Sequence, residues 1–258
     1  MNTLTVFLLI VFGWLSGALV NYLADVLPFK RRPAAPMCVH CQAEMPLLQY
    51  LFWPRLCLTC GKRRLLRTWL VEVVYLGLAL WLWGAAPAKM GFWLGWLVLV
   101  YFGVVTVIDL EHKLILHPVS LVGAVLMLLI GSYLHGLPAA LLGGAVGFGV
   151  MLGLYFLGVL LLKLVGRLRG ETIDDEALGF GDVNLSGVLG LLLGWPGIAA
   201  GLFLAVLLAG VIMGLYLLVQ VLRRRYKLLT ALPYGPFLIA AAFLILFLRD
   251  WLLAIISG

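Results

Sequence analysis

Charged residues are scarce in this sequence. Asp, Glu, Lys and Arg make up 11% of its 258 residues, whereas hydrophobic residues make up 64%, and the mean hydropathy is +1.14. Soluble domains carry roughly 25% charged residues, so this composition excludes an ordinary soluble domain. The long apolar runs also lack alternating polar residues, which excludes the strands of a membrane β-barrel. The sequence therefore predicts an all-α polytopic membrane protein.

The apolar runs predict about eight transmembrane helices, because a spanning helix needs about 20 mostly apolar residues. They cover residues 4–27, 70–86, 91–108, 117–134, 138–162, 183–195, 197–221 and 234–254. The sixth run is short and is interrupted at Gly194-Trp195-Pro196-Gly197. We divide the chain into a first transmembrane helix (1–27), a loop domain (28–69) and a transmembrane domain (70–258).

Basic residues are nearly missing from one side of these predicted helices. Sixteen of the 18 Lys and Arg residues fall in the first loop or after the third, fifth and seventh helices, and only Lys89 and Arg249 fall on or near the other side. Because basic loops stay in the cytoplasm, the rich side is predicted to be cytoplasmic, with both termini outside. A basic surface can also bind nucleic acid, but the membrane topology already accounts for the basic residues on this side. We expect the lipid bilayer as a partner and no nucleic acid.

Cysteine is rarer still, and its four copies form two C-x-x-C pairs, Cys38 with Cys41 and Cys57 with Cys60. This spacing is typical of a zinc site with four thiolate ligands. Two disulfides are the alternative, but the cytoplasm keeps thiols reduced, which favours zinc. The loop is too short for a core of its own and would need the metal to fold. Four thiolates leave no position for water, so this zinc is predicted to be structural.

Only eleven residues are acidic. Five fall in loops and are interpreted as solvated: Glu44, Glu171, Asp174, Asp175 and Glu176. Asp250 lies near the outer end of the last predicted helix, beside Arg249. The other five are predicted at cytoplasmic helix ends: Asp25, Glu72, Asp109, Glu111 and Asp182. A carboxylate where a chain enters hydrocarbon is costly, so these positions suggest function.

Asp109 lies in the segment VVTVIDLEHK, at the end of the third predicted helix, and Asp182 follows Gly179-Phe180-Gly181. Two acids at the same depth could share a water molecule. Aspartic proteases use such a pair: one carboxylate takes a proton from water, and the other, protonated, polarises the scissile carbonyl. The two glycines would let a substrate backbone pass close to Asp182. The alternative makes Asp109 a border carboxylate and Asp182 a helix N-cap, and spacing alone does not decide between them.

Several segments together resemble the type IV prepilin peptidases, which share the G-x-G-D motif with presenilin-type intramembrane proteases. They are Gly17-Ala-Leu-Val-Asn21 with Pro28, the twin C-x-x-C pairs with Arg67-Thr-Trp-Leu-Val-Glu72, IDLEHKLI, LGFGDVNL and LPYGPFL. The resemblance covers nearly the whole chain. It implies that Asp109 and Asp182 are the catalytic acids, and we take Gly179, Gly181, Glu111 and Asn184 as supporting residues.

Three positions depart from that family's usual pattern. Where the family usually has I-P-D, this chain has Ile115-Leu116-His117, with Pro118 following. The lysine usual two places after the second aspartate is Asn184, and Val26 replaces an arginine expected before Pro28. None of these changes removes an acid that hydrolysis needs. They concern substrate contacts and the charge balance around the two aspartates.

The resemblance implies a bacterial inner-membrane endopeptidase that removes the basic leader of prepilins and pseudopilins after a glycine, at the cytoplasmic face. Many such enzymes also methylate the new N-terminal amine with S-adenosylmethionine, and Glu72 is our candidate for that second site. A snorkelling acid paired with Arg67 is the alternative for Glu72. Two other classes stay open: a secondary transporter, which would place carboxylates near the membrane midplane, and a non-catalytic component of pilus or secretion assembly.

Overall fold

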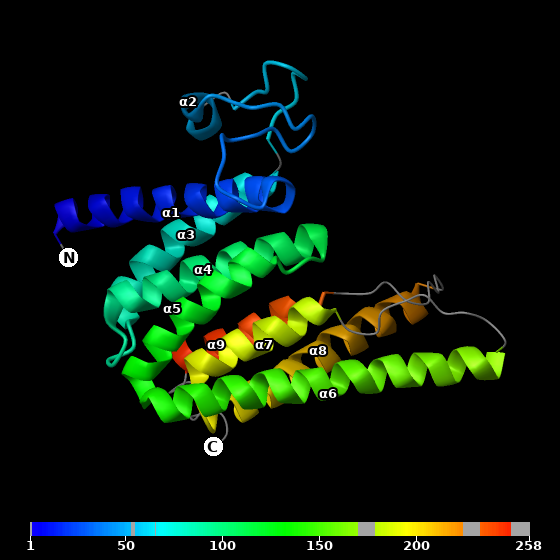
Figure 1. The fold of residues 1–258 in the computed structure, drawn as a ribbon. Coiled ribbons are helices and arrows are strands. Elements are labelled where there is room, and N and C mark those ends of the chain that lie inside the picture. The colour runs from blue at the N-terminus through cyan, green and yellow to red at the C-terminus, as the bar shows by residue number, and fades with distance from the viewer. Residues whose placement is uncertain (1, 53–54, 65, 170–178, 224–232, 249–258) are drawn as a thin grey trace. The chain divides into compact units, whose positions relative to one another are not determined.

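The computed structural model describes residues 2–52, 55–64, 66–169, 179–223 and 233–248 (Figure 1). Its helices are α1 (Thr3–Lys30), α2 (Leu47–Leu51), α3 (Leu66–Ala85), α4 (Gly91–His112), α5 (His117–His135), α6 (Leu137–Arg169), α7 (Phe180–Leu193), α8 (Gly197–Leu222) and α9 (Gly235–Phe247). Within these ranges the only β pairing is two isolated bridges. The predicted all-α membrane architecture is confirmed.

Each of the eight predicted spans corresponds to a helix. Among the described residues, six helices are long and apolar enough to cross a membrane: α1, α3, α4, α5, α6 and α8. The other two, α7 and α9, are apolar but have 14 and 13 described residues. The count of eight spans therefore stays a prediction. Asp250, Arg249 and the acids at 171 and 174–176 lie outside the described residues.

The chain divides into two compact units, Met1–His112 and Lys113–Gly258. In the first unit, α1 packs against α3 and α4. Two glycines allow the close approach: a Cβ at Gly13 would lie 2.7 Å from the Tyr75 carbonyl oxygen, and one at Gly17 would lie 2.8 Å from the Glu72 Cα. The loop between α1 and α3 is shorter than the predicted 28–69, because α1 continues through Pro28 to Lys30 and α3 begins at Leu66.

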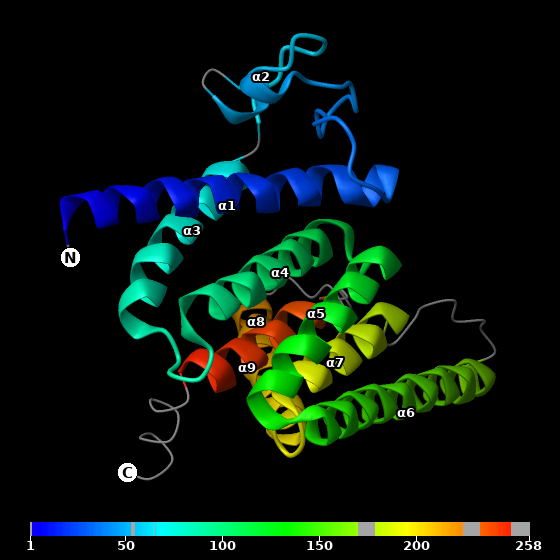
Figure 2. The same cartoon turned by 60° about the vertical axis from the view of Figure 1, so that its left-hand side comes forward.

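In the second unit, α7 is the central helix, in contact with α5, α6, α8 and α9 (Figure 2). The backbones of α5 and α6 approach that of α7 closely. A Cβ at Gly143 would lie 2.4 Å from the Gly190 carbonyl oxygen, and a Cβ at Gly131 would lie 1.9 Å from the Leu191 carbonyl oxygen. Small residues permit such contacts between membrane helices. The predicted interruption after α7 is confirmed, since Gly194 ends the helix with φ 64°. This packing fixes the helix that carries Asp182.

Candidate active site and metal site

The four cysteine sulfurs lie together, all within 4.8 Å of one another. Cys38 Sγ lies 3.7 Å from Cys60 Sγ, and Cys41 Sγ lies 3.6 Å from Cys57 Sγ, all as free thiols. Sulfurs at 2.3 Å from a tetrahedral zinc are separated by about 3.8 Å. The donor set therefore fits a four-thiolate metal site. This geometry disfavours the two-disulfide alternative.

The two C-x-x-C segments have the same backbone fold. Isolated antiparallel bridges join Met37 to Glu44 and Leu56 to Arg63. In each segment the amide four residues after the first cysteine donates to that cysteine's carbonyl, at 2.8 Å in both cases. That residue is left-handed in both, with φ 58° at Gln42 and 67° at Gly61. Each segment thus presents two thiols from one tight turn.

The loop alters the acidity of its thiols. Backbone hydrogen bonds from Cys60 and Thr59, together with hydrogen bonds from the Cys41 and Cys60 side chains, outweigh desolvation and lower the pKa of Cys57 to about 6. Burial raises the pKa of Cys38. The thiolate is the form that binds a metal. The fold of the loop therefore favours the thiolate at Cys57, whereas desolvation and hydrogen bonds with the neighbouring thiols raise the pKa of Cys41 to about 12.

Asp109 lies in the last turn of α4 and is only 4% exposed. Asp182 is the third residue of α7 and is 8% exposed. The N-cap alternative for Asp182 is wrong: Gly179 is the N-cap, and the Asp182 amide donates to its carbonyl at 3.0 Å. The two aspartates belong to different units, and their meeting at one water stays a prediction.

The two glycines around Asp182 differ in what surrounds them. A Cβ at Gly181 would lie 2.8 Å from the Cβ of Ile115, so this glycine is needed for packing against the segment before α5. A Cβ at Gly179 would meet the Asp182 carboxylate at an ordinary 3.7 Å. The role of these glycines in passing a substrate backbone close to Asp182 stays a prediction. Tyr234, at the N-cap of α9, interacts electrostatically with Asp182 and was missed as a site residue from the sequence.

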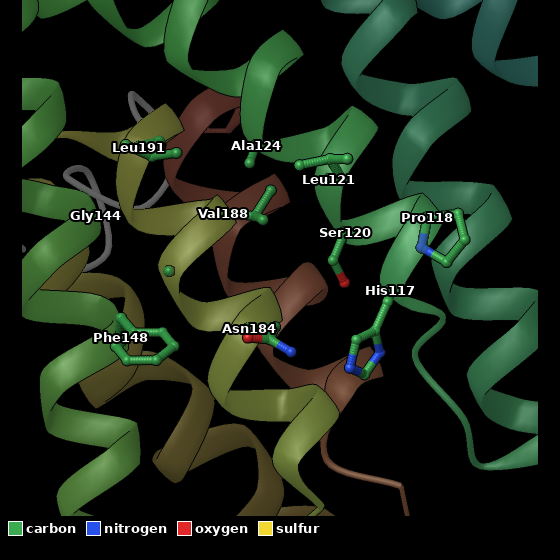
Figure 3. Close-up of a pocket in the computed structure, with 11 residues that line it drawn as sticks. His117, Pro118, Ser120, Leu121, Ala124, Gly144, Phe148, Asn184, Val188 and Leu191 are labelled. Atoms are coloured by element: carbon green, nitrogen blue, oxygen red, sulfur yellow. The ribbon is translucent and has the colours of Figure 1, made fainter.

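Asn184 lies on the opposite face of α7 from Asp182, because two residues correspond to about 200° of helix rotation. It lines a groove of about 700 Å³ formed by α5, α6 and α7. The side chains of His117, Ser120 and Asn184 gather at one end of this groove, and apolar residues line the rest (Figure 3). The structure thus brings together His117 and Asn184, two of the three departures noted in the sequence.

Glu72 is 3% exposed in the second turn of α3. The alternative that pairs it with Arg67 is wrong. Arg55, from the loop between the cysteine pairs, contacts the Glu72 carboxylate oxygens at 3.0 and 3.1 Å. Arg67 instead binds Asp25 and Glu111. Residues five apart on a helix lie about 140° apart around its axis, which separates Arg67 from Glu72.

Sequence reasoning also missed a buried cluster around Asp25, on α1. The Asp25 carboxylate accepts hydrogen bonds from the Tyr50 hydroxyl at 2.5 Å and from Arg64 at 2.7 Å, and it pairs with Arg67. One signal could have found it: Gly17, Asn21 and Asp25 recur every four residues, which places them on one helix face. That face meets α3 and the loop, where the Asn21 amide donates to the Thr68 carbonyl at 3.0 Å.

Comparison with known proteins gives concordant matches. The model of the type IV leader peptidase family matches residues 96–218, a range that includes both aspartates. A Pseudomonas putida protein named prepilin leader peptidase/N-methyltransferase is 30% identical over 78% of this chain and 65% of its own length. Proteins of the same name from Aeromonas salmonicida and Aeromonas hydrophila are 30% and 29% identical, over 85% and 88% of this chain.

This chain spans just under two thirds of the length of the Pseudomonas relative, and 72% and 76% of the two Aeromonas relatives. No solved structure matches it at comparable significance. The motifs, the two buried aspartates and these relatives agree with the resemblance found in the sequence. The chain belongs to the type IV leader peptidase family.

Proposed function

We propose that this protein is a membrane aspartic endopeptidase that removes the leader of prepilins and pseudopilins after a glycine, at the cytoplasmic face of the bacterial inner membrane. The observation that carries the proposal is the pair of buried aspartates at helix ends, Asp109 in the last turn of α4 and Asp182 in the first turn of α7. The relatives' names and the asymmetry of basic residues support the substrate and the side.

In the proposed reaction, the carboxylate form of one aspartate takes a proton from water while the resulting oxygen attacks the scissile carbonyl carbon. The protonated aspartate donates a hydrogen bond to the carbonyl oxygen, where negative charge develops. The tetrahedral intermediate then breaks its C–N bond, and a proton moves to the leaving amine. The new amine belongs to the mature protein, whose apolar helix stays in the bilayer.

We propose a structural zinc held by Cys38, Cys41, Cys57 and Cys60. A bound zinc would fix the two turns to each other, and the chemistry it supplies is structural. We further propose that the chain methylates the new N-terminus with S-adenosylmethionine. Glu72 is the candidate residue, because a carboxylate stabilises a sulfonium cation. Its pairing with Arg55 also gives it a structural contribution, so its test needs two readouts.

The transporter alternative is less well supported. Transporters place their functional carboxylates near the membrane midplane at interrupted helices. Here Asp109 and Asp182 lie within the terminal turns of their helices. A non-catalytic assembly component would require neither acid, and the Asp→Asn variants below test that alternative directly.

The proposed function is tested by incubating purified protein with a prepilin, with and without S-adenosylmethionine, and measuring the intact mass of the product. We expect loss of the leader mass, followed by gain of one methyl group. Asp109→Asn and Asp182→Asn should each lower the cleavage rate by at least about 10³-fold, because each carboxyl has its own proton-transfer role. If either variant cleaves at near the unmodified rate, the aspartic mechanism is wrong.

A further inference from the structure

Two arginines flank the second cysteine pair, and each is anchored on a different helix. Arg55 is 4% exposed, pairs with Glu72 of α3, and also donates to the Leu51 carbonyl through Nε at 2.8 Å and Nη2 at 2.6 Å. Its guanidinium lies 4.5 Å from the centre of the Trp69 ring. This side chain therefore has one defined position, and it joins the loop to α3.

Arg64, on the other side of the cysteine pair, joins the loop to α1. Its Nη2 lies 2.7 Å from the Asp25 carboxylate and 2.6 Å from the Tyr50 hydroxyl, while its guanidinium lies 3.7 Å from the centre of the Tyr50 ring. Tyr50 itself donates to Asp25 at 2.5 Å. A buried carboxylate is costly unless such partners compensate it. Asp25, 2% exposed, therefore depends on the folded loop.

The chain of contacts continues from Asp25 to α4. Arg67 of α3 binds Asp25 with one nitrogen and donates with the other to the Glu111 carboxylate at 2.8 Å. Glu111 lies two residues after Asp109, in the same last turn of α4. Two carboxylates and two guanidinium groups thus connect α1, α3, α4 and the loop, with no net charge. We call Arg64, Asp25, Arg67 and Glu111 the relay; the side chains of Arg64 and Asp25 are buried, whereas Glu111 is exposed.

We infer that the relay makes the position of the last turn of α4, and so of Asp109, depend on the metal-bound fold of the loop. In this account Arg67 and Asp25 are positioning residues, and the metal affects cleavage although it lies outside the reaction. The inference rests on the proposed function. Displacing a catalytic group by about 1 Å can cost on the order of 100-fold in rate, so a modest shift of this turn would be measurable.

The test combines metal removal with one broken contact in the relay. Glu111→Gln removes the α4 charge that Arg67 binds. Glu44→Gln is the matched control, because Glu44 is an exposed acid of the loop that carries the four cysteines. Purified protein in lipid nanodiscs is compared with and without metal, the metal being removed by a strong chelator under reducing conditions. The readouts are metal content, amide hydrogen exchange in residues 108–112, kcat and KM.

We expect metal removal from the unchanged protein and from Glu44→Gln to lower kcat on the order of tenfold with little change in KM. Exchange at 108–112 should become faster. Metal-loaded Glu111→Gln should already show a lower kcat and faster exchange at 108–112, with its metal content intact. Chelation should then lower its kcat by less than about a further threefold, because the effects of coupled sites are not additive. If metal removal lowers kcat by the same factor in all three proteins, or leaves exchange at 108–112 unchanged, the relay is contradicted. If metal-loaded unchanged protein cleaves no prepilin, the proposed function fails, whereas the exchange measurement still decides on the relay.

Discussion

At the scale of single residues, Glu72 must be separated from its partner Arg55. Glu72→Gln leaves a hydrogen-bonding side chain of the same shape at 3.0 Å from the guanidinium, but removes the charge. We expect cleavage within about threefold of the unchanged protein, since the charge-assisted bond loses only part of its strength, while methylation falls by at least about tenfold. Product mass spectrometry measures both steps on one sample.

The control for this variant is Arg55→Gln, which breaks the same ion pair from the other side. If both variants lose methylation and cleavage together, Glu72 serves the fold of the loop and has no separate chemical role. If only Glu72→Gln loses methylation, the carboxylate itself is required. A protein that never adds a methyl group in the presence of excess S-adenosylmethionine contradicts the methylation proposal as a whole.

The groove residues His117 and Asn184 give a second prediction at this scale. The resembling family usually carries aspartate and lysine at these positions. His117→Asp or Asn184→Lys alone would place one uncompensated charge at the end of a mostly apolar groove, whereas the double variant supplies both signs. We expect each single variant to lower the thermal unfolding temperature and the double variant to recover most of the loss. A coupling free energy of about 1 kcal/mol or more is expected, and additivity would contradict the pairing.

At the scale of elements, the two cysteine turns carry different residues at their left-handed position. Gln42 and Gly61 occupy the same left-handed position, where a residue other than glycine costs roughly 1–2 kcal/mol. Gln42→Gly should therefore strengthen metal retention, and Gly61→Gln should weaken it, although a Cβ at Gly61 would meet nothing within 4 Å. Competition with a chromogenic chelator measures both. Opposite shifts of about fivefold or more are expected; shifts of the same sign would show that backbone conformation does not limit binding.

The elements also show which parts of the structure the sequence could predict. Apolar runs set the helices, and most described helix ends agree with the prediction within four residues, whereas α6 continues to Arg169, past its predicted end at 162. At the first loop α1 and α3 extend beyond their predicted ends, and Asp25 of α1 pairs with Arg67 of α3, a contact that local hydropathy does not report. The cysteine cluster followed from spacing alone. The partner of Glu72 did not, since Arg55 reaches it from a separate segment of the loop.

At the scale of the whole molecule, the asymmetry of basic residues makes the topology testable. Lys89 lies between α3 and α4, and Lys113 between α4 and α5, so the two sites should face opposite sides of the membrane. A reporter that is active only outside the cytoplasm should be active when fused after Lys89 and inactive when fused after Lys113. The reverse pattern would place the metal site and both aspartates outside the cell and contradict the proposed side of cleavage.

The unequal exposure of the four thiols also determines how a metal would leave. Cys38 and Cys57 are buried, Cys60 is half-buried, and Cys41 is exposed. Of the four thiols that would hold a metal, Cys41 in the first cysteine turn is therefore the most accessible to competing thiols and alkylating reagents, followed by Cys60. The second turn, with Arg55 and Arg64 on either side, would be the last part of the loop to release the metal.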